Sequence, residues 1–283
     1  MKMKDLNSKL LTFLIISSLF FLSCNNNDTV AITDPISADE LITLIEADDV
    51  TDNVSNLIDD YFAFDQGVAA KSEENNPQFL SCMISTIVIE GSTAIVTLDF
   101  GDGCELPNGN VISGQIILNY ALDVTVHSLT ISYTYNNFYF NDLSVEGGSE
   151  IVRVRENDNG NPQSTATFDI KVTWPEGEFA TRVGTKTREW IEGFDTRDWG
   201  DNVYLITGNW NTTFKDASIC TATIIEPLRR EVVCLYIVSG IVEISKNEHT
   251  GTIDFGDGTC DNIAVFTNEL GEESEITLRG RLK

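Results

Sequence analysis

The sequence predicts an all-β protein, a large antiparallel meander with a short helical segment near its N-terminus. From Met83 onward, runs of β-branched and aromatic residues recur along the chain. Hairpin turn signals separate these runs, as in Asn157-Asp158-Asn159-Gly160 and Pro175-Glu176-Gly177. No interval between the runs is long enough for the helical crossover that parallel strands need. We therefore expect a strongly curved sheet that closes as a barrel or folds as a two-sheet sandwich.

The chain opens with a leader. Lys2, Lys4 and Lys9 precede an apolar run over 10–22, and a serine stands directly before Cys24. This order is typical of a secretory signal peptide, and the run is shorter than the roughly 20 residues that span a bilayer. A cysteine at this place resembles the bacterial lipobox, in which the thiol takes a diacylglycerol and becomes the new N-terminus. The resemblance implies lipidation of Cys24, with the membrane as a partner through acyl chains.

The net charge of the chain limits the classes of partner that it can bind. The formal net charge is −26, and the first 23 residues carry three lysines and one aspartate, a net +2, so their removal leaves −28. Such a charge keeps the body of the protein in solution and repels phosphate-rich surfaces. It excludes nucleic acid as a partner, because clustered Lys and Arg would have to supply the affinity.

Four regions follow from these observations: a signal peptide over 1–23, a flexible tether over 24–36, a helical lead-in over 37–78 and an antiparallel β domain over 79–283. Asp28-Thr29-Val30 in the tether resembles the short sites at which Bacteroidetes bacteria O-glycosylate exported proteins. This resemblance makes Thr29 a candidate O-glycosylation site.

The lead-in begins with a helix N-terminal signal. Ser37 stands three residues before Glu40, the spacing of a capping box. Apolar residues then recur every three to four positions, which predicts two short helices over 37–47 and 51–63. We expect them to pack on the edge or end of the β domain; the alternative is a helix that docks a partner.

The strands are predicted from the apolar runs and the turns between them. The candidates are 83–89, 94–100, 111–121, 125–136, 138–146, 149–155, 164–174, 179–190, 203–214, 218–226, 231–244, 250–255, 262–267 and 274–281. An apolar residue, a polar residue and a glycine recur at Gly114, Gly147, Gly208 and Gly240. A glycine inside a strand often marks a bulge or a bend, and the alternative is coincidence.

Two cysteine pairs repeat one arrangement. The core Asp-Phe-Gly-Asp-Gly ends shortly before Cys104 and again before Cys260, and Cys82 and Cys234 precede the two copies. Folding each segment as a hairpin about its midpoint places the two cysteines opposite each other, which suits a disulfide. We therefore predict Cys82–Cys104 and Cys234–Cys260, with Cys220 left over; the rival pairing is Cys220–Cys234.

The repeated core also supplies the candidate metal ligands Asp99, Asp102, Asp254 and Asp257. Carboxylate oxygens in a glycine-rich turn suit Ca²⁺. The alternative is that each aspartate caps its own turn, which is the commoner role of Asp there. No other cofactor is expected.

Aromatic and polar residues mix in the segment 190–210. Aromatic rings beside carboxylates are a typical arrangement for holding sugars, and Arg197, Asp198 and Trp199 are the candidate glycan-binding residues. By alternation Tyr204 and Trp210 belong to the core, and Trp199 to a connecting loop.

The whole chain resembles a Bacteroidetes (flavobacterial) lipoprotein family of uncharacterised activity. The resemblance rests on Phe21-Leu22-Ser23-Cys24, on the paired cysteine hairpins, and on the closing segment 237–244 that leads into Asp254-Phe255-Gly256-Asp257-Gly258. It implies an envelope location and a β-rich body. For the lipid anchor we expect the outer membrane rather than the inner one.

No catalytic constellation is visible, because His127 and His249 each stand alone and no nucleophile elbow is present. We therefore expect a non-enzymatic structural or interaction protein of the envelope, with a protein or a glycan as its partner. Two alternatives remain, a lipid-handling carrier with an apolar cavity and a surface glycan-binding module. Aromatic residues on what alternation makes both faces of 132–140 motivate the carrier.

Overall fold

The computed structural model describes residues 36–65, 82–106, 109–122, 128–196, 198 and 200–278. These residues form the helix α1 (Ala38–Asp65) and the strands β1 (Ile84–Glu90), β2 (Thr93–Asp99), β3 (Cys104–Glu105), β4 (Val111–Ala121), β5 (Ser128–Phe140), β6 (Leu143–Val154), β7 (Gln163–Thr173), β8 (Phe179–Glu192), β9 (Val203–Phe214), β10 (Ile219–Glu231), β11 (Ile237–Lys246), β12 (His249–Asp257), β13 (Ile263–Asn268) and β14 (Glu273–Thr277). Over these ranges no helix combines the length and the hydropathy needed to cross a membrane.

The strands belong to one sheet in which neighbours in space are neighbours in the chain, with β3 pairing β4 beside the main path. Every pairing is antiparallel. The predicted antiparallel meander is therefore confirmed. Among the described strands β1 and β14 end one open path, so the sheet neither closes on itself nor divides into two packed sheets. The helix takes the place of a second sheet, because it covers the apolar face of this one.

The capping box at the start of α1 is confirmed. The backbone N–H of Glu40 donates to Ser37 Oγ at 3.2 Å, and the backbone N–H of Ser37 donates to Glu40 Oε2 at 2.9 Å. The expected division into two helices is wrong, because α1 continues through Asp48 and Asp49. Contacts with the sheet hold this segment helical: Ala47 is buried and the Asp48 carboxylate accepts hydrogen bonds from β8.

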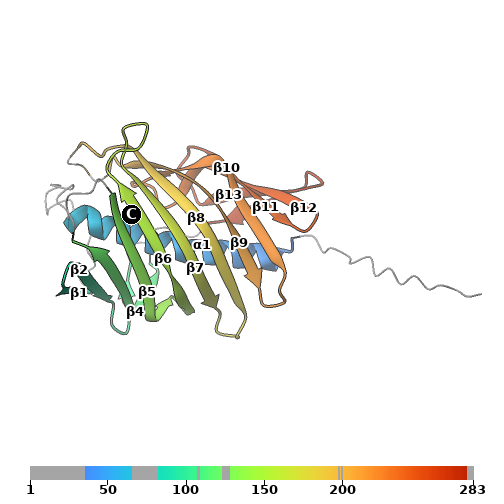
Figure 1. Ribbon diagram of the computed structural model, residues 1–283. Helices are drawn as coiled ribbons and strands as arrows, with labels where there is room; N and C mark the ends of the chain where they lie inside the picture. The colour runs from blue at the N-terminus through green and yellow to red at the C-terminus, as the bar shows by residue number, and fades with distance from the viewer. Residues whose placement is uncertain are drawn as a thin grey trace, which may run out of the picture. The chain divides into compact units, whose positions relative to one another are not determined.

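The helix lies across the strands rather than at an edge or end of the sheet, which corrects the expected position of the lead-in (Figure 1). Near its start, Lys246 Nζ of β11 donates to Glu40 Oε1 at 2.6 Å. Near its end, the Tyr61 hydroxyl lies 3.1 Å from Ser85 Oγ of β1. Apolar residues of α1 and of strands from β2 to β14 form one buried cluster. The inner face of the sheet and the helix therefore share a single core.

The recurring glycines mark bulges, which decides between the two alternatives left open by the sequence. Gly114, Gly147, Gly208 and Gly240 all have positive φ, from 80° to 145°. Each lies where the register of its strand shifts against a neighbour. A Cβ at any of the four would collide with backbone of the strand beside it. Only glycine fits these positions, and the bulges bend the strands.

One bulge explains an error in the predicted strands. The expected strands 125–136, 138–146 and 149–155 are in fact two long strands, β5 and β6, which turn at Asn141. The register shift between Thr134 and Phe138 inserts residues that change the alternation of side chains. Tyr133, Phe138 and Phe140 consequently all point into the core, and only Tyr139, 43% exposed, faces outward. The aromatic residues of 132–140 therefore lie on two faces, but the outer face carries Tyr139 alone.

Candidate ligand-binding site

The middle of α1 meets the sheet through charged groups that we name the charged seam. Arg182 Nη2 and Lys186 Nζ both donate to Asp48 Oδ1 at 2.7 Å, and Lys186 Nζ also donates to Asp52 Oδ1 at 2.7 Å. Arg188 continues this row along β8, and the whole seam comprises Arg182, Lys186 and Arg188 with Asp48, Asp52, Asn56 and Asp59. Buried charges need such partners, because an isolated ion loses its hydration on burial.

Aromatic rings of the sheet flank the cations of the seam. Lys186 Nζ lies 4.2 Å from the centre of the Trp210 ring, and the guanidinium of Arg182 lies 5.2 Å from the same ring. The guanidinium of Arg188 lies 3.9 Å from the centre of the Tyr204 ring. These cation–π contacts add attraction where the cations have left water. Trp210 and Tyr204 are buried, which confirms their predicted place in the core.

Beside the seam lies a hollow, partly open to solvent, between the first half of α1 and β9 to β12. We name it the apolar cavity. Its walls include Leu44 and Ile45 of the helix, with Trp210, Val242, Ile253 and Phe255 of the strands. Small-molecule sites typically have linings of this kind, with mostly apolar side chains and a few polar groups.

Few of the residues that line the apolar cavity are polar. Asp48 and Asp49 of α1 and Tyr236 of the loop before β11 belong to its lining. Asp48 joins the cavity to the charged seam, since the same carboxylate accepts from Arg182 and Lys186. The lining therefore suits a molecule that is apolar along most of its length and carries one small polar end.

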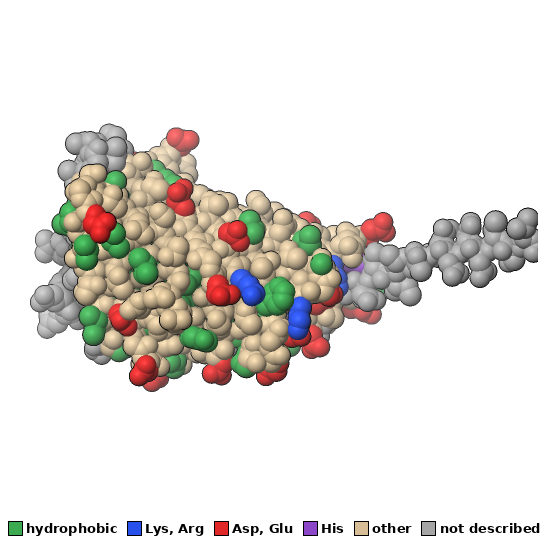
Figure 2. Space-filling model, turned by 60° about the horizontal axis from the view of Figure 1, so that its bottom comes forward, with side chains coloured by type: hydrophobic (Ala, Val, Ile, Leu, Met, Phe, Trp, Pro, Cys, Tyr) green, Lys and Arg blue, Asp and Glu red, His purple; other side chains and the backbone are tan. Residues whose placement is uncertain are grey.

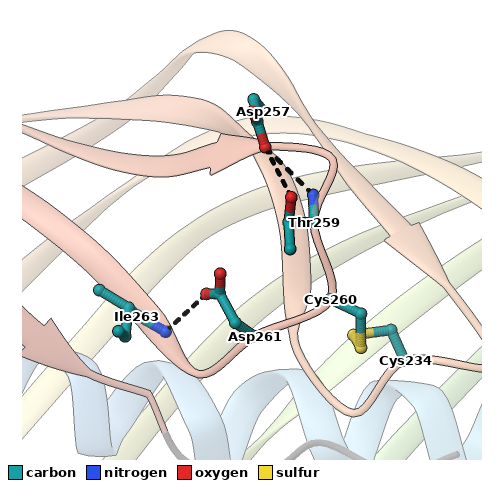
Figure 3. Close-up of a disulfide and its surroundings, with 6 residues drawn as sticks. All are labelled: Cys234, Asp257, Thr259, Cys260, Asp261 and Ile263. Carbon is teal, nitrogen blue, oxygen red and sulfur yellow. Dashed lines mark hydrogen bonds between the residues drawn. A yellow bond between two sulfur atoms is a disulfide. The ribbon is translucent and has the colours of Figure 1, made fainter.

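Both predicted disulfides are present, Cys82–Cys104 with Cα atoms 5.5 Å apart and Cys234–Cys260 with Cα atoms 5.8 Å apart. The second joins the loop after β10 to the segment after β12 (Figure 3). Cys234 precedes Tyr236 by two residues, so this disulfide anchors part of the cavity wall. Cys220 is buried and free, and the rival pairing Cys220–Cys234 is not formed.

The aspartates of the repeated core bind their own turns. Asp99 Oδ1 and Asp254 Oδ1 accept hydrogen bonds from the backbone N–H two residues later, each at 2.8 Å. Asp257 Oδ1 accepts from the hydroxyl of Thr259 at 2.9 Å (Figure 3). The hydrogen bond from the Gln115 side chain, followed by the one from the Gly101 backbone, holds the pKa of Asp99 below its ordinary value.

The structure does not bring the four candidate metal ligands together. Asp99 ends β2 and Asp102 lies in the turn that follows, whereas Asp254 and Asp257 belong to β12. Over the described ranges no three His, Cys, Asp or Glu side chains form a metal-binding group. Each repeat of the core therefore acts locally as a turn.

The other candidate residues lie apart from the cavity or outside the described residues. Asp198 Oδ1 accepts a hydrogen bond from the backbone N–H of Gly200 at 2.9 Å and so stabilises its own turn. His249 Nδ1 lies 2.6 Å from Glu269 Oε1. The remaining candidates, Cys24, Thr29, His127, Arg197 and Trp199, lie outside the described residues.

Two signals in the sequence could have revealed the charged seam. Asp48, Asp52 and Asn56 recur every four residues, so they share one face of a helix. Arg182, Lys186 and Arg188 take alternate positions that the pattern of β8 turns inward. When the periodicity of a helix and of a strand both assign polar residues to the buried face, the two elements are expected to meet at those residues.

The charge distribution on the surface differs from that of the interior. Acidic side chains are scattered over the face shown in Figure 2, with few Lys and Arg among them.

No family model, no curated protein and no solved structure matches the chain.

Proposed function

We propose that this chain is a lipid-anchored protein of the cell envelope that binds an apolar molecule of the acyl-chain type in the apolar cavity. The observation that carries the proposal is the hollow with aliphatic and aromatic walls between α1 and β9 to β12. The role is binding and transfer, without chemistry on the ligand. It corresponds to the lipid-handling alternative derived from the sequence.

The leader and the place of the cavity support this proposal together. Cys24, the candidate acylation site, stands 13 residues before Ser37. A fully extended chain of this length reaches about 45 Å. Leu44 and Ile45, in the first turns of the helix that follows, line the cavity. An anchor at Cys24 would therefore keep the cavity within reach of the membrane that supplies the ligand.

A photo-crosslinking experiment tests the proposal. The full chain in lipid nanodiscs is exposed to a C16 fatty acid bearing a diazirine, and the labelled peptides are mapped after irradiation. We expect labels on β11 and β12. Ala222→Phe, which places a ring in the cavity from β10, should reduce this labelling at least fivefold.

The matched control is Thr223→Phe, which adds the same ring to the adjacent position of β10, on the opposite face of the sheet. Thermal unfolding of both variants shows that they are folded; if Ala222→Phe is not, Val242→Phe fills the same hollow. Equal labelling of the two variants, or labels spread evenly over the chain, would contradict the proposal.

A second candidate function, the binding of a protein partner, is favoured by β1. All seven of its residues are exposed, and Ile84, Ile87, Val88 and Ile89 are apolar. Among the described strands β1 pairs only with β2, so no described strand covers its other edge, where backbone groups can accept an added strand. Such an edge suits an extended apolar segment of another protein. The chain's charge of −26 disfavours a second copy of itself.

A photoreactive amino acid at Ile87 tests this second candidate in the native cell. The control position is Val183 on β8, because both residues are 51% exposed. We expect one heterologous adduct from position 87 and none from position 183. An adduct of twice the chain's mass, or identical adducts from both positions, would refute a specific partner at β1.

A further inference from the structure

Lys186 lies between two carboxylates at the centre of the charged seam. Its Nζ donates to Asp48 Oδ1 and to Asp52 Oδ1, each at 2.7 Å. The two aspartates belong to consecutive turns of α1, whereas the lysine belongs to β8, 134 residues beyond Asp52 in the chain. One amine and two carboxyl groups from distant parts of the chain therefore meet at hydrogen-bond distance.

These three side chains have little contact with solvent. The side chains of Lys186 and Asp52 are each 8% exposed, and that of Asp48 is 16% exposed. The Trp210 ring forms a further wall, with its centre 4.2 Å from Lys186 Nζ. Such surroundings hold the amine and the carboxyl groups in place and limit the entry of water.

We propose that Lys186 and Asp52 condense to form an isopeptide bond, which joins β8 to α1 covalently. A lysine amine acts as a nucleophile toward a carbonyl carbon once it has lost a proton. The carboxyl carbon of Asp52 is one bond beyond the oxygen that the lysine contacts, so it lies within about 4 Å of Nζ, near the roughly 3 to 3.5 Å of a reacting pair. This inference goes beyond the proposed ligand binding and does not depend on it.

The reaction needs neither an oxidant nor a reductant. A proton passes from Lys186 Nζ to the Asp52 carboxylate, and the neutral amine then forms a bond from Nζ to the carboxyl carbon. Asp48 accepts a second proton from Nζ and delivers it to the hydroxyl group on that carbon, and the C–O bond breaks. One water molecule leaves, one amide bond remains, and Asp48 returns to its original state.

Arg182 determines which aspartate accepts the proton and which becomes the amide. Its Nη2 donates to Asp48 Oδ1 at 2.7 Å, and its side chain has no exposed surface. If Asp48 became the amide, this buried guanidinium would lose its anion, which is costly. Asp48 therefore stays a carboxylate and Asp52 forms the bond. The product replaces a buried ion pair by a neutral amide, and so removes the cost of keeping two charges out of water.

Peptide mapping of the full chain, after reduction and denaturation, tests the proposal. Trypsin and a glutamate-specific protease together release peptide 47–71, and they release peptide 183–188 whole only if Lys186 is blocked. We expect a branched peptide that weighs one water molecule less than the sum of the two, with the branch at Asp52. Recovery of peptide 47–71 by itself, with cleavage after Lys186, would overturn the proposal, and so would a branch at Asp48.

Lys246 and Glu40 provide a matched control within the same chain. Lys246 Nζ lies 2.6 Å from Glu40 Oε1, and the two side chains are 9% and 18% exposed. Over the described ranges no second carboxylate contacts Lys246, so a proton acceptor like Asp48 is missing there. We expect no branched peptide between these two residues. Equal crosslinking of both lysines would mean that contact alone suffices, and would contradict the role of Asp48.

Two variants separate a covalent bond from a salt bridge. Lys186→Arg keeps the positive charge but lacks the amine, so it should give no branched peptide. Asp52→Asn should give a branched peptide of the same mass as the parent, because an amide side chain reacts with loss of ammonia instead of water. A branched peptide from Lys186→Arg would refute the assignment of the lysine.

Cleavage with cyanogen bromide gives an independent readout. Met83 is the only methionine beyond the leader, so cleavage after it separates α1 from the described strands. After reduction of the disulfide Cys82–Cys104, the two fragments of the parent chain should stay together on a denaturing gel, and those of Lys186→Arg should separate. Separation of the parent fragments would show that only a salt bridge joins Lys186 to the helix.

Discussion

Arg182 Nη2 lies 2.7 Å from Asp48 Oδ1, and this contact joins the interior of the sheet to the middle of the helix. Arg182 is fully buried, with no exposed surface. A helix that met the sheet through leucines alone could shift along it, whereas a carboxylate between Arg182 and Lys186 fits in one register only. The charged seam therefore specifies where α1 lies, and so shapes the apolar cavity beside it.

The first prediction concerns this contact. Asp48→Ala leaves Arg182 and Lys186 buried with one carboxylate fewer, and it should lower the free energy of unfolding by about 3 to 5 kcal/mol. The double variant Asp48→Leu with Arg182→Met should lose less than the single one, because it leaves fewer unmatched charges. Urea denaturation measures both. The exposed pair Lys215–Glu178 gives the control, and Glu178→Gln should cost less than about 1 kcal/mol.

The second prediction concerns the bulges. Gly208 has a φ of 145°, and a Cβ there would meet the backbone of Thr185 and Lys186 on β8. Gly208→Ala should therefore destabilise the protein by about 2 kcal/mol or more, through strain and overpacking. Gly103→Ala is the matched control, because the nearest side-chain atom would lie 3.6 Å from its Cβ. Equal melting temperatures for the two variants would contradict the role of the bulge.

Local signals in the sequence predicted most of the sheet. The antiparallel order, the capping box at Ser37, the bulge glycines and both disulfides all depend on residues close together in the chain, where turn chemistry and spacing decide the structure. The wrong prediction of three strands where β5 and β6 lie also comes from reliance on local signals. Asn136 and Asn137 look like a turn, but their strand continues because it pairs with β6 across a bulge.

The place of the helix could not be predicted in this way. Its contacts with β8 join residues more than 120 positions apart, as in Arg188 with Asn56. Propensity disfavours aspartate inside a helix, yet α1 continues through Asp48 and Asp49. The lining of the apolar cavity could not be predicted from the sequence either, because its walls come from one helix and four strands that only the tertiary structure brings together.

The third prediction concerns pH. Burial raises the pKa of Glu40, but hydrogen bonds from Lys246 and Ser37 outweigh it, and the net pKa is lowered from 4.5. Ionised Glu40 therefore contributes stability above pH 4.5, and this contribution is lost as the pH falls through the lowered pKa. Glu40→Gln should cost about 1 to 2 kcal/mol at pH 7 and much less at pH 3.

Lys246, which donates a hydrogen bond to Glu40, determines how the stability of the protein changes at high pH. Burial lowers the pKa of Lys246, but its hydrogen bond to Glu40 outweighs this effect and the net pKa is raised from 10.5. The stability from Lys246 is thus present below pH 10.5 and is lost as the pH rises through the raised pKa. Urea denaturation from pH 3 to 8 measures the acid limb, with Glu248→Gln in the following turn as the control. A constant difference between Glu40→Gln and the parent chain would contradict the linkage.

The fourth prediction concerns Cys220, the free cysteine of β10. Burial, and then the negative charge of Glu40, raise the pKa of its thiol to about 11. At pH 8 only about one thiol in a thousand is therefore ionised, and the thiolate is the form that reacts. Iodoacetamide should leave Cys220 unlabelled in the folded protein and label it fully in 8 M urea. Val183→Cys on the exposed face of β8 gives the control thiol, which should react within minutes. Rapid labelling of native Cys220 would show that this part of the core opens, and the apolar cavity beside Ala222 would open with it.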